Sequence, residues 1–216
     1  REQEIEKLEN YISSRKSEFI AIYGRRRIGK TFLVKELFEN RFAFRVTGKD
    51  NVTTKEQLTS FSFALNDQLG IETDVTNWPE AFRLLQKALE KMTDGTKIIF
   101  FDELPWFDTY ASNFISALEH FWNDWAFYRS DIKLITCGSA TTWMLNQVIN
   151  SRGGLHNRIT HNILLSPFKL HEVEEYFKSQ GFYYERPEII ECYMAMGGVA
   201  YYLSLFENNK SVAQNI

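Results

Sequence analysis

The stretch FIAIYGRRRIGKTF, residues 19–32, decides the fold of this chain. Apolar, β-prone residues lead into Gly24, which opens a G-x-x-x-x-G-K-[ST] pattern that closes at Lys30 and Thr31. An apolar-periodic segment follows at once, so the pattern predicts a strand, a glycine loop and a helix. That order is the context a phosphate-binding loop requires. A chance match in an ordinary strand-to-helix turn is the competing interpretation.

The residue types in the glycine loop predict which part of a nucleotide each would contact. Backbone N–H groups of the loop and of the following helix N-terminus would face a polyphosphate. Lys30 would reach the β- and γ-phosphates, and the Thr31 hydroxyl would hold Mg²⁺. The loop residues expected to contact nucleotide are Gly24, Arg25, Arg26, Arg27, Ile28, Gly29, Lys30, Thr31 and Phe32.

The three loop arginines, residues 25–27, have several possible roles. One could reach the nucleotide phosphates, an adjacent subunit or a DNA phosphate, because a guanidinium suits all three. Solvated loop arginines are the alternative, and at least one of the three is expected to be of that kind.

A second buried strand is predicted at residues 97–104, KIIFFDEL, and it contains Asp102 and Glu103. Two carboxylates at the tip of a buried strand need a reason, since burying charge is costly. Asp102 can bind Mg²⁺, and Glu103 can act as a general base on the attacking water. A helix cap or solvated loop carboxylates is the alternative, which the preceding phosphate-binding loop disfavours.

A third buried strand, residues 132–139 (IKLITCGS), ends in small and polar residues. Ser139, or Thr136 before it, lies where a strand-end side chain can sense a γ-phosphate. A plain strand-to-helix turn with Ser139 near a helix cap is an equal alternative.

The remaining periodicity alternates strands and helices up to about residue 166, after which only helices follow. This shift predicts a parallel-sheet core at residues 1–166 and a helical lid at residues 167–216. Further strands are predicted at residues 42–46 and 159–165, and helices at residues 2–14, 53–69, 80–92, 107–129, 141–150, 170–179, 188–196 and 201–206.

Length and composition fit one α/β domain with a small helical part: 216 residues, 44% hydrophobic, net charge −3. The charge gives no global attraction to nucleic acid. Cys137 and Cys192 follow no metal spacing, which favours a reduced cytoplasmic setting. No apolar run reaches the length of a membrane span, so no membrane association is expected. The Arg start and the abrupt end suggest a fragment of a longer protein.

Together these segments resemble the prokaryotic ATPases of the AAA+/STAND-like branch of P-loop NTPases, and more narrowly the archaeal-type ATPase family. The resemblance spans essentially the whole chain. It rests on YGRRRIGKTFLVKEL, IIFFDEL, LITCGSA, the loop at residues 152–158, LSPFKLHEVEEYF, MGGVAYYL and the opening REQEIEKL. The family usually has Pro where this chain has Ala200, which puts nucleotide-dependent lid movement in question.

The resemblance implies a three-layer α/β/α fold with a parallel five-stranded sheet in the order 5-1-4-3-2. It also implies that Arg1 lies on a helix near the adenine and that an arginine near Arg158 contacts the γ-phosphate, often across a subunit boundary. A surface residue before a strand is the equal alternative for Arg158, and Arg152 is a weaker candidate. Family members usually continue into a winged-helix region, which could carry DNA binding and does not fit in this chain.

These observations predict a cytoplasmic, Mg²⁺-dependent ATPase that converts nucleotide state into a conformational switch. No N-K-x-D guanine motif is present, which favours adenine. A homo-oligomer is allowed, and this chain is expected to bind DNA weakly at most. The alternatives are a nucleotide-binding switch without useful turnover and, behind it, a P-loop small-molecule kinase.

Overall fold

The computed structural model describes residues 1–93, 95–150, 155 and 157–216, and the chain divides into two compact units. The first, which we call the sheet unit, contains Arg1–Tyr23 and Thr31–Leu164. The second, the helical unit, contains Gly24–Lys30 and Leu165–Ile216. The glycine loop therefore groups with the C-terminal helices. The Arg152 hypothesis lies outside the described residues.

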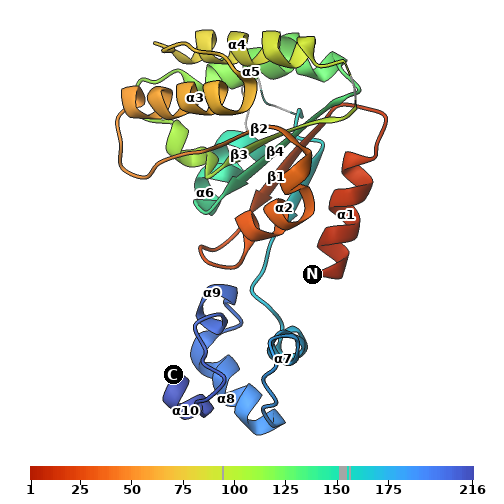
Figure 1. Cartoon of the computed structure of the whole chain (residues 1–216), viewed down its shortest axis with the longest axis vertical. Helices are drawn as coiled ribbons and strands as arrows, with labels where there is room; N and C mark the ends of the chain where they lie inside the picture. Colours follow the sequence, from red (N-terminus) through yellow and green to blue (C-terminus); the bar gives the residue numbers. More distant parts are fainter. Residues whose placement is uncertain (94, 151–154, 156) are drawn as a thin grey trace. The chain divides into compact units, whose positions relative to one another are not determined.

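The sheet unit is built on five parallel strands (Figure 1). Their spatial order is β2-β3-β4-β1-β5, so the expected order 5-1-4-3-2 is confirmed. The apolar runs around β1, β3 and β4 are buried along their whole length, as central parallel strands require. The strands are β1 (Glu18–Tyr23), β2 (Phe42–Thr47), β3 (Lys97–Asp102), β4 (Ile132–Gly138) and β5 (His161–Leu164).

Helices flank both faces of this sheet, and Figure 1 shows α3, α4 and α5 on one side and α1 and α2 on the other. An aromatic cluster fills the space beneath the first group, where Trp78 packs edge-on against Phe61 and Phe107. The helices are α1 (Glu2–Ile12), α2 (Lys30–Phe38), α3 (Thr54–Leu69), α4 (Trp78–Lys91), α5 (Phe114–Asp124) and α6 (Thr141–Trp143).

Local sequence signals set the ends of α3. The Thr53 hydroxyl accepts a hydrogen bond from the Glu56 backbone N–H at 3.3 Å, and Glu56 Oε2 accepts one from the Thr53 N–H at 2.8 Å. This reciprocal pair satisfies two of the orphan donors of a helix start. Gly70 ends the helix in a left-handed conformation, φ 64°.

The prediction of one helical region over residues 107–129 is wrong. The chain forms a 3₁₀ turn at Leu104–Phe107, a break, helix α5 and a second 3₁₀ turn at Ala126–Tyr128. Ala111 and Asn113 adopt left-handed backbone, φ 53° and 56°, which no continuous right-handed helix contains. The aromatic side chains of these separate segments pack into one core, and for this reason their spacing in the sequence resembles that of a single helix. Residues 141–150 likewise divide, into α6 and the π-helix Met144–Ile149.

The helical unit has its own apolar core, formed by residues such as Val173, Phe177, Cys192 and Leu203. Burial raises the pKa of the Cys192 thiol to about 11, so this cysteine packs as an apolar side chain. The unit contains α7 (Leu170–Ser179), α8 (Arg186–Met196), α9 (Ala200–Leu203) and α10 (Val212–Asn215), the last of which the sequence pattern had not predicted.

Among the described residues, no helix combines the length and the apolar character that crossing a membrane would require.

Candidate functional site

The glycine loop, Gly24–Lys30, is the first component of the site. Lys30 is buried, and its Nζ donates hydrogen bonds to the carbonyl oxygens of Gly24 (3.0 Å) and Arg25 (2.9 Å). The Lys30 ammonium is therefore held beside the loop that is expected to bind phosphate. A Cβ on Gly24 would lie 2.3 Å from the Leu165 carbonyl oxygen, and the φ of 143° disfavours a side chain there as well. This position accepts only glycine.

Thr31 and Asp102 form the second component, within the sheet unit. The Thr31 hydroxyl donates to Asp102 Oδ1 at 2.9 Å, which joins the start of α2 to the end of β3. The Glu103 backbone N–H donates to the same oxygen at 3.1 Å. Hydroxyl and carboxylate oxygens are the hard ligands that Mg²⁺ prefers.

No group of three or more His, Cys, Asp and Glu side chains that could hold a metal ion occurs in the described part of the chain. A pair such as Thr31 and Asp102 suits Mg²⁺ that is bound mostly by phosphate oxygens and water. The donor set thus fits the nucleotide-linked metal that the loop predicts.

Glu103 and Ser139 form the third component. The Ser139 hydroxyl and backbone N–H both donate to Glu103 Oε2, at 2.8 and 3.0 Å. Glu103 itself adopts left-handed backbone, φ 49°, which is uncommon for this residue type. The ends of β3 and β4 thus hold the carboxylate in one place, and two donors orient it.

Two carboxylates, Asp102 and Glu103, lie side by side at this edge of the sheet. Burial raises the pKa of Asp102, and the neighbouring Glu103 carboxylate raises it further. The hydrogen bond from Thr31 and the charge of Lys35 act in the opposite direction. Desolvation and like charge are the two causes that poise carboxylates for proton and metal chemistry.

Two residues that sequence reasoning missed hold together the chain segments that follow β2 and β3, next to these carboxylates. Buried Gln57 donates from Nε2 to the carbonyl oxygens of Lys49 (2.7 Å) and Trp106 (2.8 Å), and so joins the segments after β2 and β3. Gly48 lets them approach, because a Cβ there would lie 2.7 Å from the Glu103 carbonyl oxygen. The sequence signal that could have identified Gln57 is a glutamine on the apolar face of a predicted helix.

A family model described as an ATPase domain predominantly from Archaea matches residues 1–206. The chain belongs to this archaeal ATPase family. It is therefore an ATPase domain of that family, and the expected archaeal-type ATPase family is confirmed.

Two proteins of Methanocaldococcus jannaschii are similar to this ATPase domain in sequence. The uncharacterized protein MJECL04 is 30% identical over 206 residues, which are 94% of this chain and 42% of that protein. The uncharacterized ATP-binding protein MJ0423 is 46% identical over 41 residues, or 19% of this chain and 70% of that protein. The chain spans less than half of MJECL04.

Solved structures share the fold. The Walker-type ATPase PABY2304 of Pyrococcus abyssi has a TM-score of 0.71 at 18% identity, covering 100% of this chain and 69% of that one. The STAND protein PH0952 of Pyrococcus horikoshii has a TM-score of 0.57 at 20% identity, covering 95% and 29%. Cdc6p of Pyrobaculum aerophilum has a TM-score of 0.58 at 17% identity, covering 82% and 48%. The α/β P-loop fold of the archaeal ATPase is thereby shown.

Arg158 and Arg1 are two further residues of the ATPase domain that the sequence predicted for the site. The Arg158 guanidinium lies 4.9 Å from the centre of the Phe127 ring, and the Phe127 carbonyl accepts a hydrogen bond from Ser17 before β1. Arg158 therefore lies where the strands begin, which we call the N-terminal edge of the sheet. Asp102 lies at the opposite, C-terminal edge, where the strands end. The structure does not bring the two together within one chain. Arg1 pairs with Glu4 at 3.7 Å at the start of α1.

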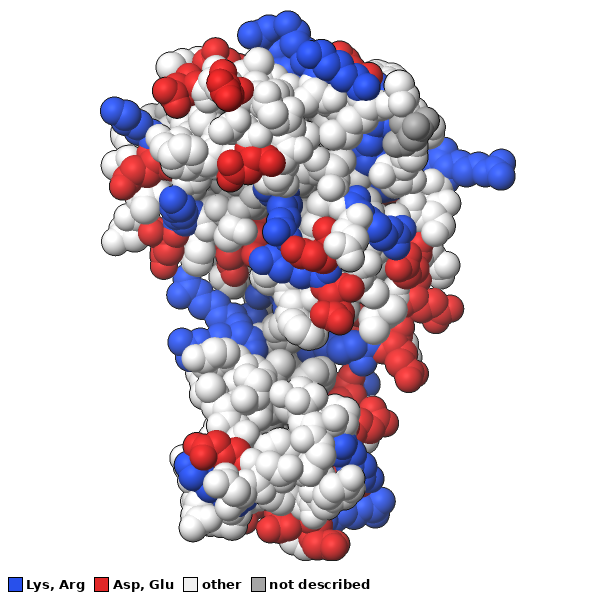
Figure 2. Space-filling view, viewed as in Figure 1, with Lys and Arg blue, Asp and Glu red and all other residues white. Residues whose placement is uncertain are grey.

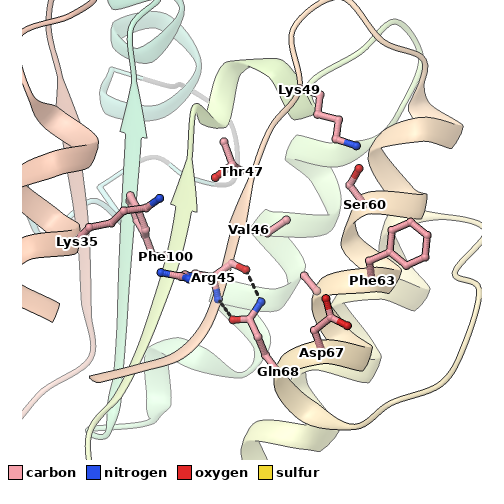
Figure 3. A pocket seen from close by; sticks show the side chains of 11 residues that line it. Lys35, Arg45, Val46, Thr47, Lys49, Ser60, Phe63, Asp67, Gln68 and Phe100 are labelled. Carbon is pink, nitrogen blue, oxygen red and sulfur yellow. Dashed lines mark hydrogen bonds between the residues drawn. The ribbon is translucent and has the colours of Figure 1, made fainter. Parts of the chain in front are cut away.

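A separate hollow of about 360 Å³ lies beside β2, the strand at one edge of the sheet (Figure 3). Gln68 of α3 pairs with both backbone groups of Arg45 there, accepting from its N–H and donating to its carbonyl, each at 2.8 Å. This side-chain amide blocks strand addition at that point. The lining includes none of the predicted site residues: Lys35, Arg45, Val46, Thr47, Lys49, Ser60, Phe63, Ala64, Asp67, Gln68 and Phe100.

Proposed function

We propose that this chain is the Mg²⁺-dependent, ATP-hydrolysing domain of a switch ATPase. The observation that carries the proposal is the hydrogen bond from the Thr31 hydroxyl to Asp102 at 2.9 Å. It places the residue after the phosphate-loop lysine beside a buried strand-end carboxylate, and Glu103 follows directly. Metal ligands and a candidate base are thus adjacent, as nucleotide hydrolysis needs.

The chain's own residues divide the work. Lys30 and the loop N–H groups hold the phosphates, while Thr31 and Asp102 hold the metal. Mg²⁺, when bound, would neutralise charge on the β- and γ-phosphates. Glu103 accepts the proton of the attacking water at its carboxylate, which Ser139 orients. Arg158 lies at the opposite end of the strands, so its proposed role on the γ-phosphate requires a second copy of the chain.

Phosphate release tests the proposal directly. We expect Glu103→Gln to lower the turnover of ATP by roughly 10²- to 10⁴-fold while ATP binding is kept, because the base is lost and the shape is not. Lys30→Ala should remove ATP binding itself. Glu72→Gln, an exposed loop carboxylate, is the matched control and should change neither. Wild type that turns over no faster than Glu103→Gln would refute hydrolysis.

A binding switch without turnover is the second candidate, and one observation favours it. Glu103 Oε2 already accepts two hydrogen bonds from Ser139, which occupy one of the two carboxylate oxygens that could accept from a water. In that case ATP and ADP bind with measurable affinity, and Glu103→Gln leaves phosphate release unchanged. Phosphorylated acceptor in place of free phosphate would instead indicate a kinase.

Nucleic acid is not proposed as a direct ligand of this chain. Figure 2 shows basic and acidic side chains interspersed over the sheet unit on the face in view, and the net charge is −3. A salt-sensitive complex with DNA at sub-micromolar concentration would contradict this, because phosphate contacts release counterions. Homo-oligomer formation and a cytoplasmic setting remain part of the proposal.

A further inference from the structure

Arg27 holds an unusual place in the glycine loop. Its backbone is left-handed, φ 68°, although it carries a long side chain, and such a conformation persists only where surrounding contacts enforce it. The direction of the N–H groups in a phosphate-binding loop follows from these backbone angles. Whatever enforces the conformation of Arg27 therefore also sets the geometry of the phosphate cradle.

The enforcing contacts come from α9, in the same compact unit as the loop. Arg27 Nη1 donates to the Tyr202 hydroxyl at 3.2 Å, and the guanidinium carbon lies 4.8 Å from the Tyr201 ring centre and 5.7 Å from that of Tyr202. The Tyr201 N–H donates to the Arg27 carbonyl at 3.1 Å. Both backbone and side chain of Arg27 are thus fixed by two consecutive tyrosines.

A second contact joins α9 to the loop, between Ala200 at the start of α9 and Gly29. A Cβ on Gly29 would lie 3.9 Å from the Cβ of Ala200, the residue before Tyr201. Gly198, two residues earlier, has φ 67°, and a Cβ there would lie 2.1 Å from the Phe168 carbonyl oxygen. The Gly197-Gly198 break thus anchors the start of α9 to the segment before α7, and α9 in turn contacts the loop.

We propose that Arg27 is a positioning residue that fixes the phosphate loop through Tyr201 and Tyr202, so that α9 controls how tightly the loop holds phosphate. Its planar guanidinium faces two aromatic rings, an arrangement that keeps the charge and restricts the side chain. The effect on nucleotide rests on the proposed function, whereas the effect on loop conformation does not.

Hydrogen exchange of the nucleotide-free chain tests the loop effect alone. We expect the double variant Tyr201→Leu/Tyr202→Leu, and to a smaller extent Tyr202→Phe, to speed exchange of the amides at residues 25–29. Tyr183→Leu is the matched control, since Tyr183 is an exposed tyrosine of the same unit. Unchanged exchange in a folded double variant, judged by its melting temperature and far-UV spectrum, would overturn the proposal.

A double-mutant cycle with a fluorescent ADP analogue tests the nucleotide effect. Arg27→Lys keeps the charge and loses the planar contact, so we expect affinity to fall about tenfold in wild type and less than twofold in the tyrosine double variant. An equal loss in both backgrounds would mean that Arg27 contacts phosphate directly, and would overturn the proposal. No binding even by wild type would refute the proposed function, and the exchange result would then decide the loop effect alone.

Discussion

The sheet has an N-terminal edge, where its parallel strands begin, and a C-terminal edge, where they finish. Both contain buried charge, but the partners of that charge are of different kinds. At the N-terminal edge, Lys133 is fully buried and donates from Nζ to the Ser14 carbonyl (2.8 Å) and hydroxyl (2.9 Å) and to the Lys16 carbonyl. Asp131 beside it binds Lys97 at 2.7 Å and Arg129 at 2.8 Å. Each charge there has partners of complementary character.

At the C-terminal edge, Asp102 and Glu103 carry like charge in adjacent positions and receive neutral donors, chiefly hydroxyls and backbone N–H groups. The pKa shifts express this difference. The guanidinium of Arg129 holds the pKa of Asp131 well below its usual range, whereas burial raises that of Asp102. Charge paired with cations at one edge supports the fold, whereas carboxylates that accept from neutral donors at the other edge keep their negative charge for a cationic ligand.

The largest expected effect comes from breaking the N-terminal edge. Lys133→Met keeps the volume and removes the donor, which leaves three carbonyls (the third that of Ser130) and a hydroxyl without it, so we expect about 2–3 kcal/mol lower unfolding free energy. Chemical denaturation measures this. Lys169→Met, at an exposed position before α7, is the matched control. A stability equal to wild type would show that this edge does not depend on the buried lysine.

The next prediction compares how the contributions of the two aspartates to stability depend on pH. Asp131 has a lowered pKa, so its contribution is present above its ordinary titration range and is lost as pH falls through the folded value. Asp102 has a raised pKa, so the folded state binds the proton more tightly and stability falls as pH rises through that window.

We therefore expect Asp131→Asn to lower the unfolding free energy at pH 7 by about 1–2 kcal/mol, because hydrogen bonds to a charged group are lost. Asp102→Asn should leave it equal or higher. The advantage of Asp102→Asn over wild type should shrink as pH is lowered. Denaturation curves at several pH values measure both, and the same sign of change for the two variants would contradict the contrast between the edges.

The smallest expected effect is at Ser139. Ser139→Ala removes one of two donors to Glu103, and the backbone N–H at 3.0 Å remains, so we expect turnover to fall by only about fivefold, roughly 1 kcal/mol. Steady-state phosphate release measures it, and the Km for ATP should stay unchanged. Ser60→Ala, on α3, is the control. Faster turnover in Ser139→Ala would mean that the hydroxyl restrains Glu103 instead of orienting it.

Local signals were enough for much of this molecule. The glycine pattern and the apolar runs before and after it predicted β1, the loop and α2, because each signal lies within a few residues of the element it specifies. The buried run before Asp102 predicted β3 in the same way. The sheet order came from family resemblance, since no local signal says which strands are neighbours.

Contacts distant in sequence were beyond such signals. Arg27 and Tyr202 are 175 residues apart, and Gln57 and Trp106 are 49 apart. The spacing also misled over residues 107–129, where aromatics shared one core although Ala111 and Asn113 interrupt the helix.

By itself, the sequence determined which residues could hold phosphate and metal, because a phosphate-binding loop and a strand-end carboxylate are each local patterns. Only the tertiary structure decided which distant partners each carboxylate has and how deeply it is buried. Lys97, 34 residues away in the chain, pairs with Asp131, and Thr31, 71 residues away, donates to Asp102. A carboxylate's pKa depends on burial and on such donors, so the folded surroundings lower the pKa of Asp131 and raise that of Asp102.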